Sequence, residues 1–169
     1  MGNIEAKNKD QWTALIFASQ MGHFDTVELL LANNANIGIN ALTMAALNGH
    51  TGTVKLLLEN GANILWSGAV LMAASLNGHT ETVQLLLKND AIINAQNKQG
   101  VTALILASQM GHFDTVELLL ENGAKVDLQN KDGTTALMVA AKYGHTDTVK
   151  LLLENGAKTN TQTRIDGLH

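Results

Sequence analysis

The chain has 169 residues, of which 46% are apolar, 4% aromatic and 15% charged, and its formal net charge at pH 7 is −4. It contains no cysteine, which excludes disulfides and thiolate zinc sites, and no basic cluster, which argues against a nucleic acid as the main partner. The longest apolar stretch, near 69–76, is too short to span a bilayer and no apolar leader opens the chain, so we expect an intracellular, cytoplasmic protein without membrane contact.

An internal repeat runs through the sequence. Each copy carries a Gly-His pair, followed by a Thr-Val and then by three leucines, as in 148–149 and 151–153. The five glycines of these pairs lie 27, 29, 33 and 33 residues apart, at Gly22, Gly49, Gly78, Gly111 and Gly144. A period of this length is typical of a solenoid, in which each unit buries its apolar face only against its neighbours.

The repeat divides the chain into five units and the start of a sixth. The approximate bounds of the five are 3–35, 36–62, 63–91, 92–124 and 125–157, and residues 158–169 look like the opening of a sixth. No Pro- or Ser-rich linker separates the units, so we expect one continuous array. The sixth opening and the lack of a polar capping repeat at either end favour a fragment of a longer array.

The first unit is predicted to contain a hairpin-like segment, a helix, a short turn and a second helix. Its hairpin has Gln11 at the tip position that glycine occupies in the fourth and fifth units. In the second and third units the helices are intact, but the hairpin segment is shorter by six and four residues. We therefore expect these two units to have only a short connection, which should dent one edge of the stack.

The fourth unit nearly repeats the first. Residues 13–31 and 102–120 differ only at one position, where Phe17 corresponds to Leu106. Recent duplication and design would both explain this near-identity, and the sequence leaves both origins open.

The fifth unit shows the predicted elements most clearly. Residues 135–143 form a short helix that the Thr135 hydroxyl can cap, and the Gly-His pair ends it. Residues 146–154 form a second helix with apolar positions on one face, and Gly156 ends it because glycine can adopt the left-handed conformation. Two helices joined by so short a turn must pack antiparallel.

These features together resemble a known family. Residues 132–157 match almost throughout the pattern Asp-Gly-x-Thr-x-Leu-x-x-Ala-x-x-x-Gly-His-x-x-x-Val-x-x-Leu-Leu-x-x-Gly-Ala, which resembles the ankyrin repeat. The resemblance covers about the whole chain, and five copies in register make it specific. It implies an all-α fold, namely an α-solenoid of stacked helix-turn-helix ankyrin-type repeats with hairpin-like loops.

The chain departs from the family pattern at the start of the first helix. The family usually has Thr-Pro-Leu-His there, whereas this chain has alanine after Thr13, Thr102 and Thr135 and an apolar residue in place of the histidine. Alanine lacks the fixed φ that proline supplies at the first helical position. The missing histidine should remove a Thr–His hydrogen bond and put an apolar contact in its place.

The repeated histidines could suggest a metal site, but their spacing argues against one. Neighbouring units are separated by about 8–10 Å, the helix packing distance, whereas zinc needs nitrogen ligands at about 2.0–2.1 Å. We therefore expect each imidazole to brace its turn through a hydrogen bond to the backbone. These structural turn residues are His23, His50, His79, His112 and His145.

No catalytic constellation is evident. Ser19, Ser75 and Ser108 occupy small-residue positions of the first helices, where tight packing explains them better than nucleophilic catalysis. The sequence shows no Ser-His-Asp order and no Gly-rich phosphate loop. We expect a protein that is not an enzyme and has no cofactor or metal.

The resemblance also implies a binding surface. In ankyrin-like proteins, partners usually contact the concave face, which consists of the hairpin tips and the outward positions of the first helices. Carried onto this sequence, that face comprises Trp12, Met21, Leu47, Trp66, Leu76, Val101, Met110, Lys131, Asp132, Lys142 and Tyr143. Exposed apolar stripes tend to mark partner sites, and Trp, Tyr and Met are enriched there. Some members could instead pack between units, since Met often fills irregular gaps.

The sequence therefore predicts a monomeric, non-catalytic scaffold that binds a protein or a peptide on its concave face. An engineered or excised repeat array without a native ligand remains the alternative, in which the apolar stripe would serve self-association or packing between units. An enzyme or metal protein is the third interpretation, and metal analysis of the purified protein would test its most plausible form.

Overall fold

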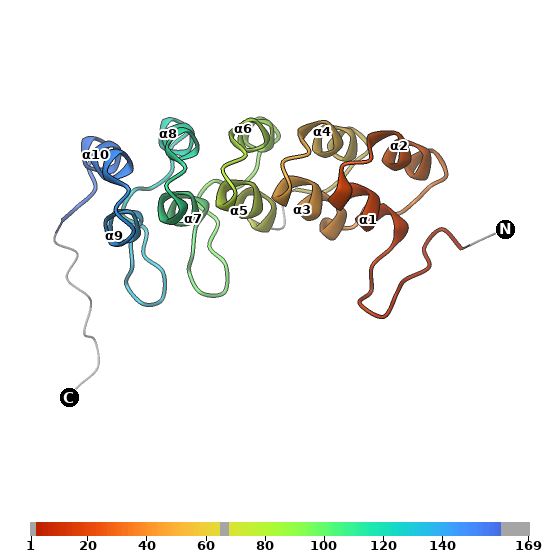
Figure 1. Cartoon of the computed structure of the whole chain (residues 1–169), viewed down its shortest axis with the longest axis horizontal. Helices are drawn as coiled ribbons and strands as arrows, with labels where there is room; N and C mark the ends of the chain where they lie inside the picture. Colours follow the sequence, from red (N-terminus) through yellow and green to blue (C-terminus); the bar gives the residue numbers. More distant parts are fainter. Residues whose placement is uncertain (1–2, 65–67, 160–169) are drawn as a thin grey trace.

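The computed structural model describes residues 3–64 and 68–159, and these form ten helices in two layers (Figure 1). The inner helices, on the side of the hairpin loops, are α1 (Ala14–Met21), α3 (Ile39–Leu47), α5 (Ala69–Leu76), α7 (Ala103–Met110) and α9 (Ala136–Lys142). The outer helices are α2 (Phe24–Ala32), α4 (Thr51–Glu59), α6 (Thr80–Lys88), α8 (Phe113–Glu121) and α10 (Thr146–Glu154). None of these helices has the length and apolar character that crossing a membrane requires.

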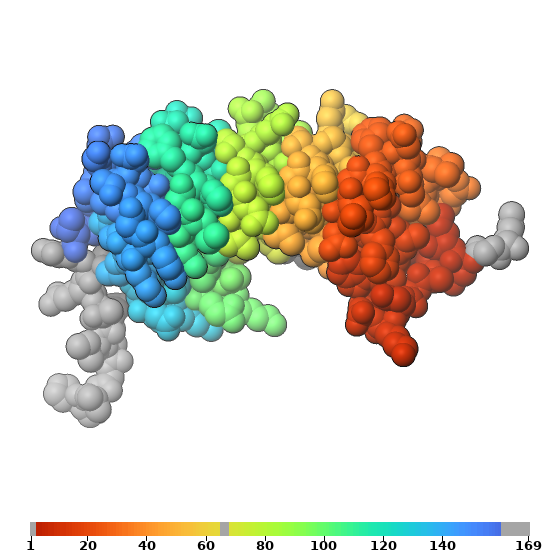
Figure 2. Space-filling view, in the orientation of Figure 1, coloured from red at the N-terminus to blue at the C-terminus, as the bar shows by residue number. Residues whose placement is uncertain are grey.

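Each unit is an antiparallel helix pair that stacks on the next pair. The inner helices pack in the order α1, α3, α5, α7 and α9, and the outer helices follow the same order with less extensive contacts. Because the inner layer is the more closely packed, the stack curves toward it, and the space-filling view shows an arch (Figure 2). The all-α solenoid predicted from the repeat is confirmed.

One apolar core runs through all five units. The second, third and fourth units supply the same positions to it, and the core is built mainly from leucine, valine and alanine rather than from large aromatic rings. The leucines that are at least 98% buried are Leu15, Leu42, Leu57, Leu71, Leu86, Leu104, Leu119 and Leu152. Burial of a leucine side chain contributes about 1.5–3 kcal/mol, so these positions hold the layers together.

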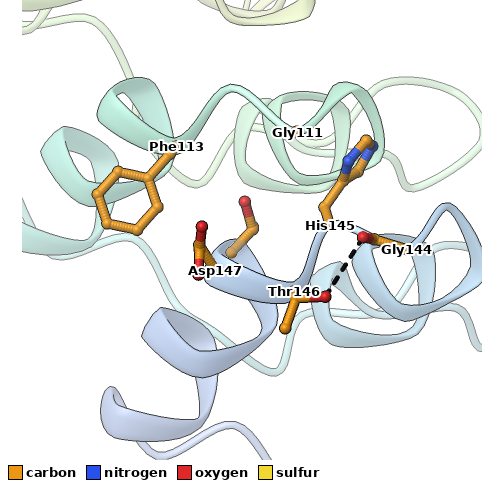
Figure 3. A pocket seen from close by; sticks show the side chains of 7 residues that line it. Gly111, Phe113, Gly144, His145, Thr146 and Asp147 are labelled. Carbon is orange, nitrogen blue, oxygen red and sulfur yellow. Dashed lines mark hydrogen bonds between the residues drawn. The ribbon is translucent and has the colours of Figure 1, made fainter.

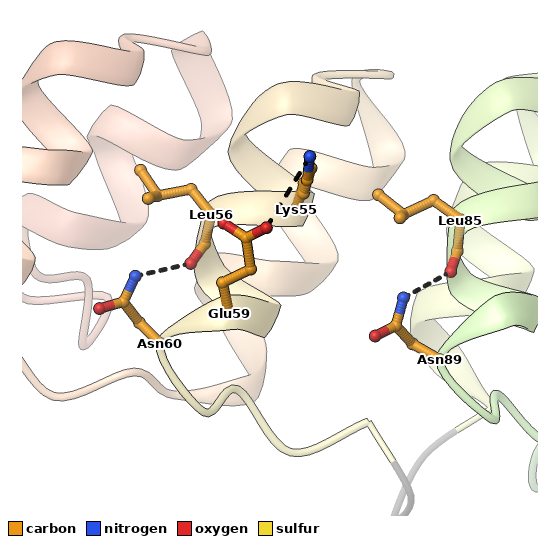
Figure 4. A network of polar contacts seen from close by, with 6 residues as sticks. All are labelled: Lys55, Leu56, Glu59, Asn60, Leu85 and Asn89. Atoms are coloured by element: carbon orange, nitrogen blue, oxygen red, sulfur yellow. Dashed lines mark hydrogen bonds and ion pairs between the residues drawn. The ribbon is translucent and has the colours of Figure 1, made fainter.

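Side chains next to the helix ends satisfy free backbone groups. The hydroxyls of Thr13, Thr102 and Thr135 accept from the N–H three residues on, which confirms the predicted cap of Thr135. Asparagines follow the outer helices and donate back to a carbonyl four residues earlier, as Asn60 and Asn89 do in Figure 4. Local sequence signals therefore set the N-terminal ends of these three inner helices and the C-terminal ends of the outer helices.

Hairpins form in the first, fourth and fifth units, whose segments have the full length. In each, the side chain of Asn8, Asn97 or Asn130 accepts two backbone N–H groups and closes the loop. Gln11 has φ +64°, close to the +76° of the glycines at the same tip position. In the second unit only residues 33–38 connect α2 to α3, and the lower edge of the arch is indented between its protruding ends (Figure 2). Part of the equivalent connection in the third unit lies outside the described residues.

Three serines of the inner helices are buried at the contact between units. The Oγ atoms of Ser19, Ser75 and Ser108 are fully buried and make no hydrogen bond within the described structure. Ala46 occupies the same position in the second unit and is equally buried. The site therefore accepts a methyl group without needing a hydroxyl.

Replacing Ser75 with alanine is expected to stabilise the protein by about 1 kcal/mol, because an unpaired buried hydroxyl carries a desolvation cost and alanine has the higher helix propensity. Urea unfolding followed by circular dichroism measures the change, with Ser75→Thr as the control that keeps the hydroxyl. A lower urea midpoint for Ser75→Ala than for the wild type would contradict the assignment.

Candidate functional site

The N-terminal end of the inner face carries an aromatic patch. The rings of Trp12 and Phe17 pack with centroids 5.0 Å apart, and the exposed fractions are 46% for Phe17 and 60% for Met21. Trp12 is half-buried, and its backbone N–H donates to the Asn8 side chain at 2.8 Å. The hairpin therefore holds the tryptophan against α1 and leaves a rigid apolar surface beside it.

A second patch lies at the C-terminal end of the inner face. Met110 and Tyr143, which hold the same position in successive units, are 47% and 52% exposed. The Lys142 ammonium lies 5.4 Å from the centroid of the Tyr143 ring, a cation–π distance, and the centroid of the stacked His145 ring lies 6.3 Å from it. Val101, two residues before the start of α7, is half-buried. The tyrosine is thus oriented by its neighbours while its ring remains accessible.

The middle of the inner face is polar. Leu47 and Leu76 are half-buried, whereas the next residue in each helix pair, Asn48 or Asn77, is exposed. The Asn77 side chain donates to the Leu47 carbonyl at 2.7 Å and so joins α3 and α5. The predicted apolar set is therefore split into two patches.

The remaining predicted residues lie at or near the hairpin tips. Lys131 and Asp132 are exposed, and the Lys131 N–H donates to the Gln99 carbonyl at 2.9 Å, which ties the fifth hairpin to the fourth. Trp66 lies outside the described residues.

Phe17 is a surface residue that the sequence reasoning did not include. It lies four residues before Met21 on α1, so the two side chains share one face. One sequence signal could have drawn attention to Phe17. It replaces Leu106 at the only position where residues 13–31 and 102–120 differ. Leucine at this position is half-buried, whereas phenylalanine extends to meet Trp12.

The turn histidines connect neighbouring units. Nε2 of His50, His79, His112 and His145 lies 2.9 to 3.0 Å from a carbonyl oxygen of the preceding inner helix. Each imidazole therefore reaches across the unit boundary instead of bonding within its own turn. His23, in the first unit, is exposed.

The rings of His50, His79, His112 and His145 each lie against the glycine of the preceding unit. A Cβ placed on Gly49 would stand 2.5 Å from Nδ1 of His79, and the same separation recurs between Gly22 and His50. Figure 3 shows the equivalent pair, Gly111 and His145. The contact between a glycine and the histidine of the next unit thus repeats along the stack.

A comparison with protein families decides the classification. The model of a family described as ankyrin repeats (3 copies) matches residues 2–67 and 71–163. The chain belongs to the ankyrin repeat family. No curated protein matches it. Ankyrin repeats are generally protein–protein interaction modules, and the family is typically non-catalytic.

The ankyrin stack has a surface pocket between its last two units, with a volume of about 510 Å³ (Figure 3). It lies at the start of α10, and its lining includes Phe113, His145 and Asp147. Nε2 of His145 lies 2.9 Å from the Gln109 carbonyl oxygen, so this bond to the fourth unit fixes the orientation of the imidazole. Within residues 3–64 and 68–159, no group of three or more His, Asp or Glu side chains could hold a metal ion.

Proposed function

We propose that the chain is a non-catalytic scaffold, a single ankyrin array that binds a protein or a peptide on its inner, concave face. The observation that supports the proposal is the pair of exposed apolar patches, with Trp12, Phe17 and Met21 at one end and Met110 and Tyr143 at the other. Tryptophan and tyrosine are over-represented among the residues that dominate binding energy at protein interfaces.

The rigidity of this face favours binding. The patches project from helices that are already packed, so little conformational entropy is lost when a partner docks. The Trp12–Phe17 contact and the Lys142–Tyr143 contact further restrict the aromatic side chains.

The polar centre suggests the form of the partner. Asn48 and Asn77 separate the two patches, so a partner that uses both must place one apolar anchor at each end. Between the anchors it would face asparagine side chains, which favour polar groups or backbone. An extended segment with two separated apolar residues meets these requirements.

The test begins with affinity capture and mass spectrometry on the wild-type protein. For a captured protein, Trp12→Ala and Tyr143→Ala should each weaken binding about tenfold or more, as expected of dominant interface residues. Gln84→Ala, on the exposed surface of α6, is the control and should bind like the wild type. Unchanged affinity in both inner-face variants, or a loss in the control, would contradict the proposal.

An engineered or excised array without a native ligand is the alternative. The near-identity of residues 13–31 and 102–120 favours it, since design and recent duplication both produce such copies. In that case the capture experiment would return no protein whose recovery depends on Trp12 or Tyr143.

A further inference from the structure

Charge is divided unequally between the two layers of helices. In the part of the chain that the structure describes, the five outer helices carry nine acidic and three basic residues, whereas the five inner helices carry a single charged residue, Lys142. The convex side of the arch is therefore strongly negative, and the inner helices add no negative charge to the concave side (Figure 1). A negatively charged partner is repelled from the outer helices and directed to the inner face.

A lysine occupies the same position in each of the three hairpins. Lys9, Lys98 and Lys131 each follow the asparagine that closes the loop, and all three are exposed. Within residues 3–64 and 68–159 none of the three forms an ion pair, whereas two of the three lysines on the outer helices pair with a carboxylate, at 3.8 and 3.4 Å. The hairpin tips therefore offer unpaired positive charges along the edge of the inner face.

Two of the acidic residues in the hairpin segments are engaged by the backbone of the next unit. The Glu5 carboxylate accepts the Asn36 N–H at 2.8 Å, and the Asp127 carboxylate accepts the Lys158 N–H at 3.0 Å. These carboxylates are held between units, away from the tips, and so leave the charge of the tip lysines in place.

The positive charge is concentrated at the end of the inner face that carries Tyr143. An aspartate follows the tip lysine in the first and fifth hairpins, whereas the uncharged Gln99 follows Lys98. The Lys131 N–H donates to the Gln99 carbonyl at 2.9 Å, so the fourth and fifth tips lie side by side. Together with Lys142, which contacts the Tyr143 ring, these two tips bring three lysines and one aspartate to this end.

The first hairpin shows no such excess. Lys7 and Lys9 are matched in number by Glu5 and Asp10, so the apolar patch around Trp12 has a neutral border. The two apolar patches of the inner face therefore differ in the charge that surrounds them, and a partner that fits both must itself be unequally charged.

We propose that the partner of the inner face is an acidic protein segment, whose carboxylates lie beside Lys98, Lys131 and Lys142 and flank an apolar residue on Met110 and Tyr143. A second apolar residue of the same segment, without acidic neighbours, occupies the patch at the N-terminal end. This inference rests on the proposed function, because it names the chemistry of the partner that binds the same face.

The spacing of the units sets the length of this segment. One patch lies in the first unit and the other in the fourth and fifth, three to four units away. Neighbouring helices pack about 8–10 Å apart, so the patches are separated by about 24–40 Å. An extended chain rises about 3.3 Å per residue, so about 7–12 residues separate the two apolar anchors of the partner.

Selection from a displayed library of random peptides, long enough to carry both anchors, tests the inference on the full chain. Peptides whose binding is lost in Trp12→Ala and Tyr143→Ala should be enriched in Asp and Glu around one apolar residue, relative to the unselected library. Such peptides without acidic enrichment would overturn the acidic partner and leave the proposed function standing. A selection that returns no peptide dependent on Trp12 or Tyr143 would overturn both.

Charge reversal then tests the lysines, with fluorescence anisotropy of a labelled peptide from that selection as the readout. Combined Lys98→Glu and Lys131→Glu should weaken its binding about tenfold, because two attractive contacts become repulsive. Combined Lys55→Glu and Lys88→Glu is the matched control, since it changes the net charge equally but on the outer helices, and it should bind like the wild type. Equal affinities of the two double variants would contradict the assignment of the lysines.

Salt provides a second readout that does not depend on substitution at the apolar patches. Raising the sodium chloride concentration should weaken binding of the peptide to the wild type more than to the variant with Lys98→Glu and Lys131→Glu, because salt screens exposed charge pairs. The same salt dependence in both proteins would show that these lysines do not contact the peptide's carboxylates, and would overturn the inference.

Discussion

Replacing Gly49 with alanine is expected to destabilise the protein by about 2–4 kcal/mol, because the new methyl group meets both backbone strain and a steric clash. Gly49 has φ +70°, a left-handed conformation that L-residues adopt at a cost. The added Cβ would also stand 2.5 Å from Nδ1 of His79. That ring cannot move freely, since its Nε2 lies 3.0 Å from the Leu47 carbonyl.

Gly144→Ala separates the cost of backbone strain from the cost of the steric clash. Gly144 has φ +74°, close to that of Gly49, but its Cβ position has no neighbour within 4 Å. We therefore expect a loss of only about 1–2 kcal/mol, from the backbone alone. Urea unfolding of both variants, followed by circular dichroism, measures the difference. Equal losses would show that the histidine contact does not constrain the stack.

Replacing Leu57 with alanine is expected to cost about 2–5 kcal/mol, because the removed atoms leave a cavity in a fully packed interior. Leu57 lies on α4, in the middle of the stack, with no exposed surface, and units on both sides cover it. In a repeat protein the stability depends on contacts between nearest neighbours, so loss of a central contact weakens both halves.

Leu30→Ala is the control for this prediction. Leu30 holds the same position in the first unit but is only half-buried. Its replacement should cost clearly less than that of Leu57. Differential scanning calorimetry of the two variants provides the comparison. A loss for Leu30→Ala as large as that for Leu57→Ala would contradict a core whose stability comes from stacking on both sides.

The elements of the fold could be predicted because their signals are local. A threonine before the inner helix and an Asn-Gly after the outer helix satisfy backbone groups within a few residues, and residues 146–154 have the predicted bounds as α10. The shortened second unit was also evident from counting, because removed residues must come from a loop when both helices are intact.

The contacts between units could not be predicted in the same way. A fixed period shows that His79 recurs but not whether its imidazole bonds within its own turn or to Leu47 of the preceding unit. The rotation between layers decides this, and it has no sequence signal. The same applies to exposure on the inner face, where Leu47 is half-buried and Met21 is not.

Hydrogen exchange of the complex with a captured partner tests the account most directly, because it reports which backbone becomes protected. Binding on the concave face should slow exchange in the first hairpin and at the C-terminal ends of α1, α7 and α9, near Trp12, Met21, Met110 and Tyr143. The outer helices α2, α4, α6 and α8 should exchange as they do in the free protein. Protection confined to the outer helices would contradict the account.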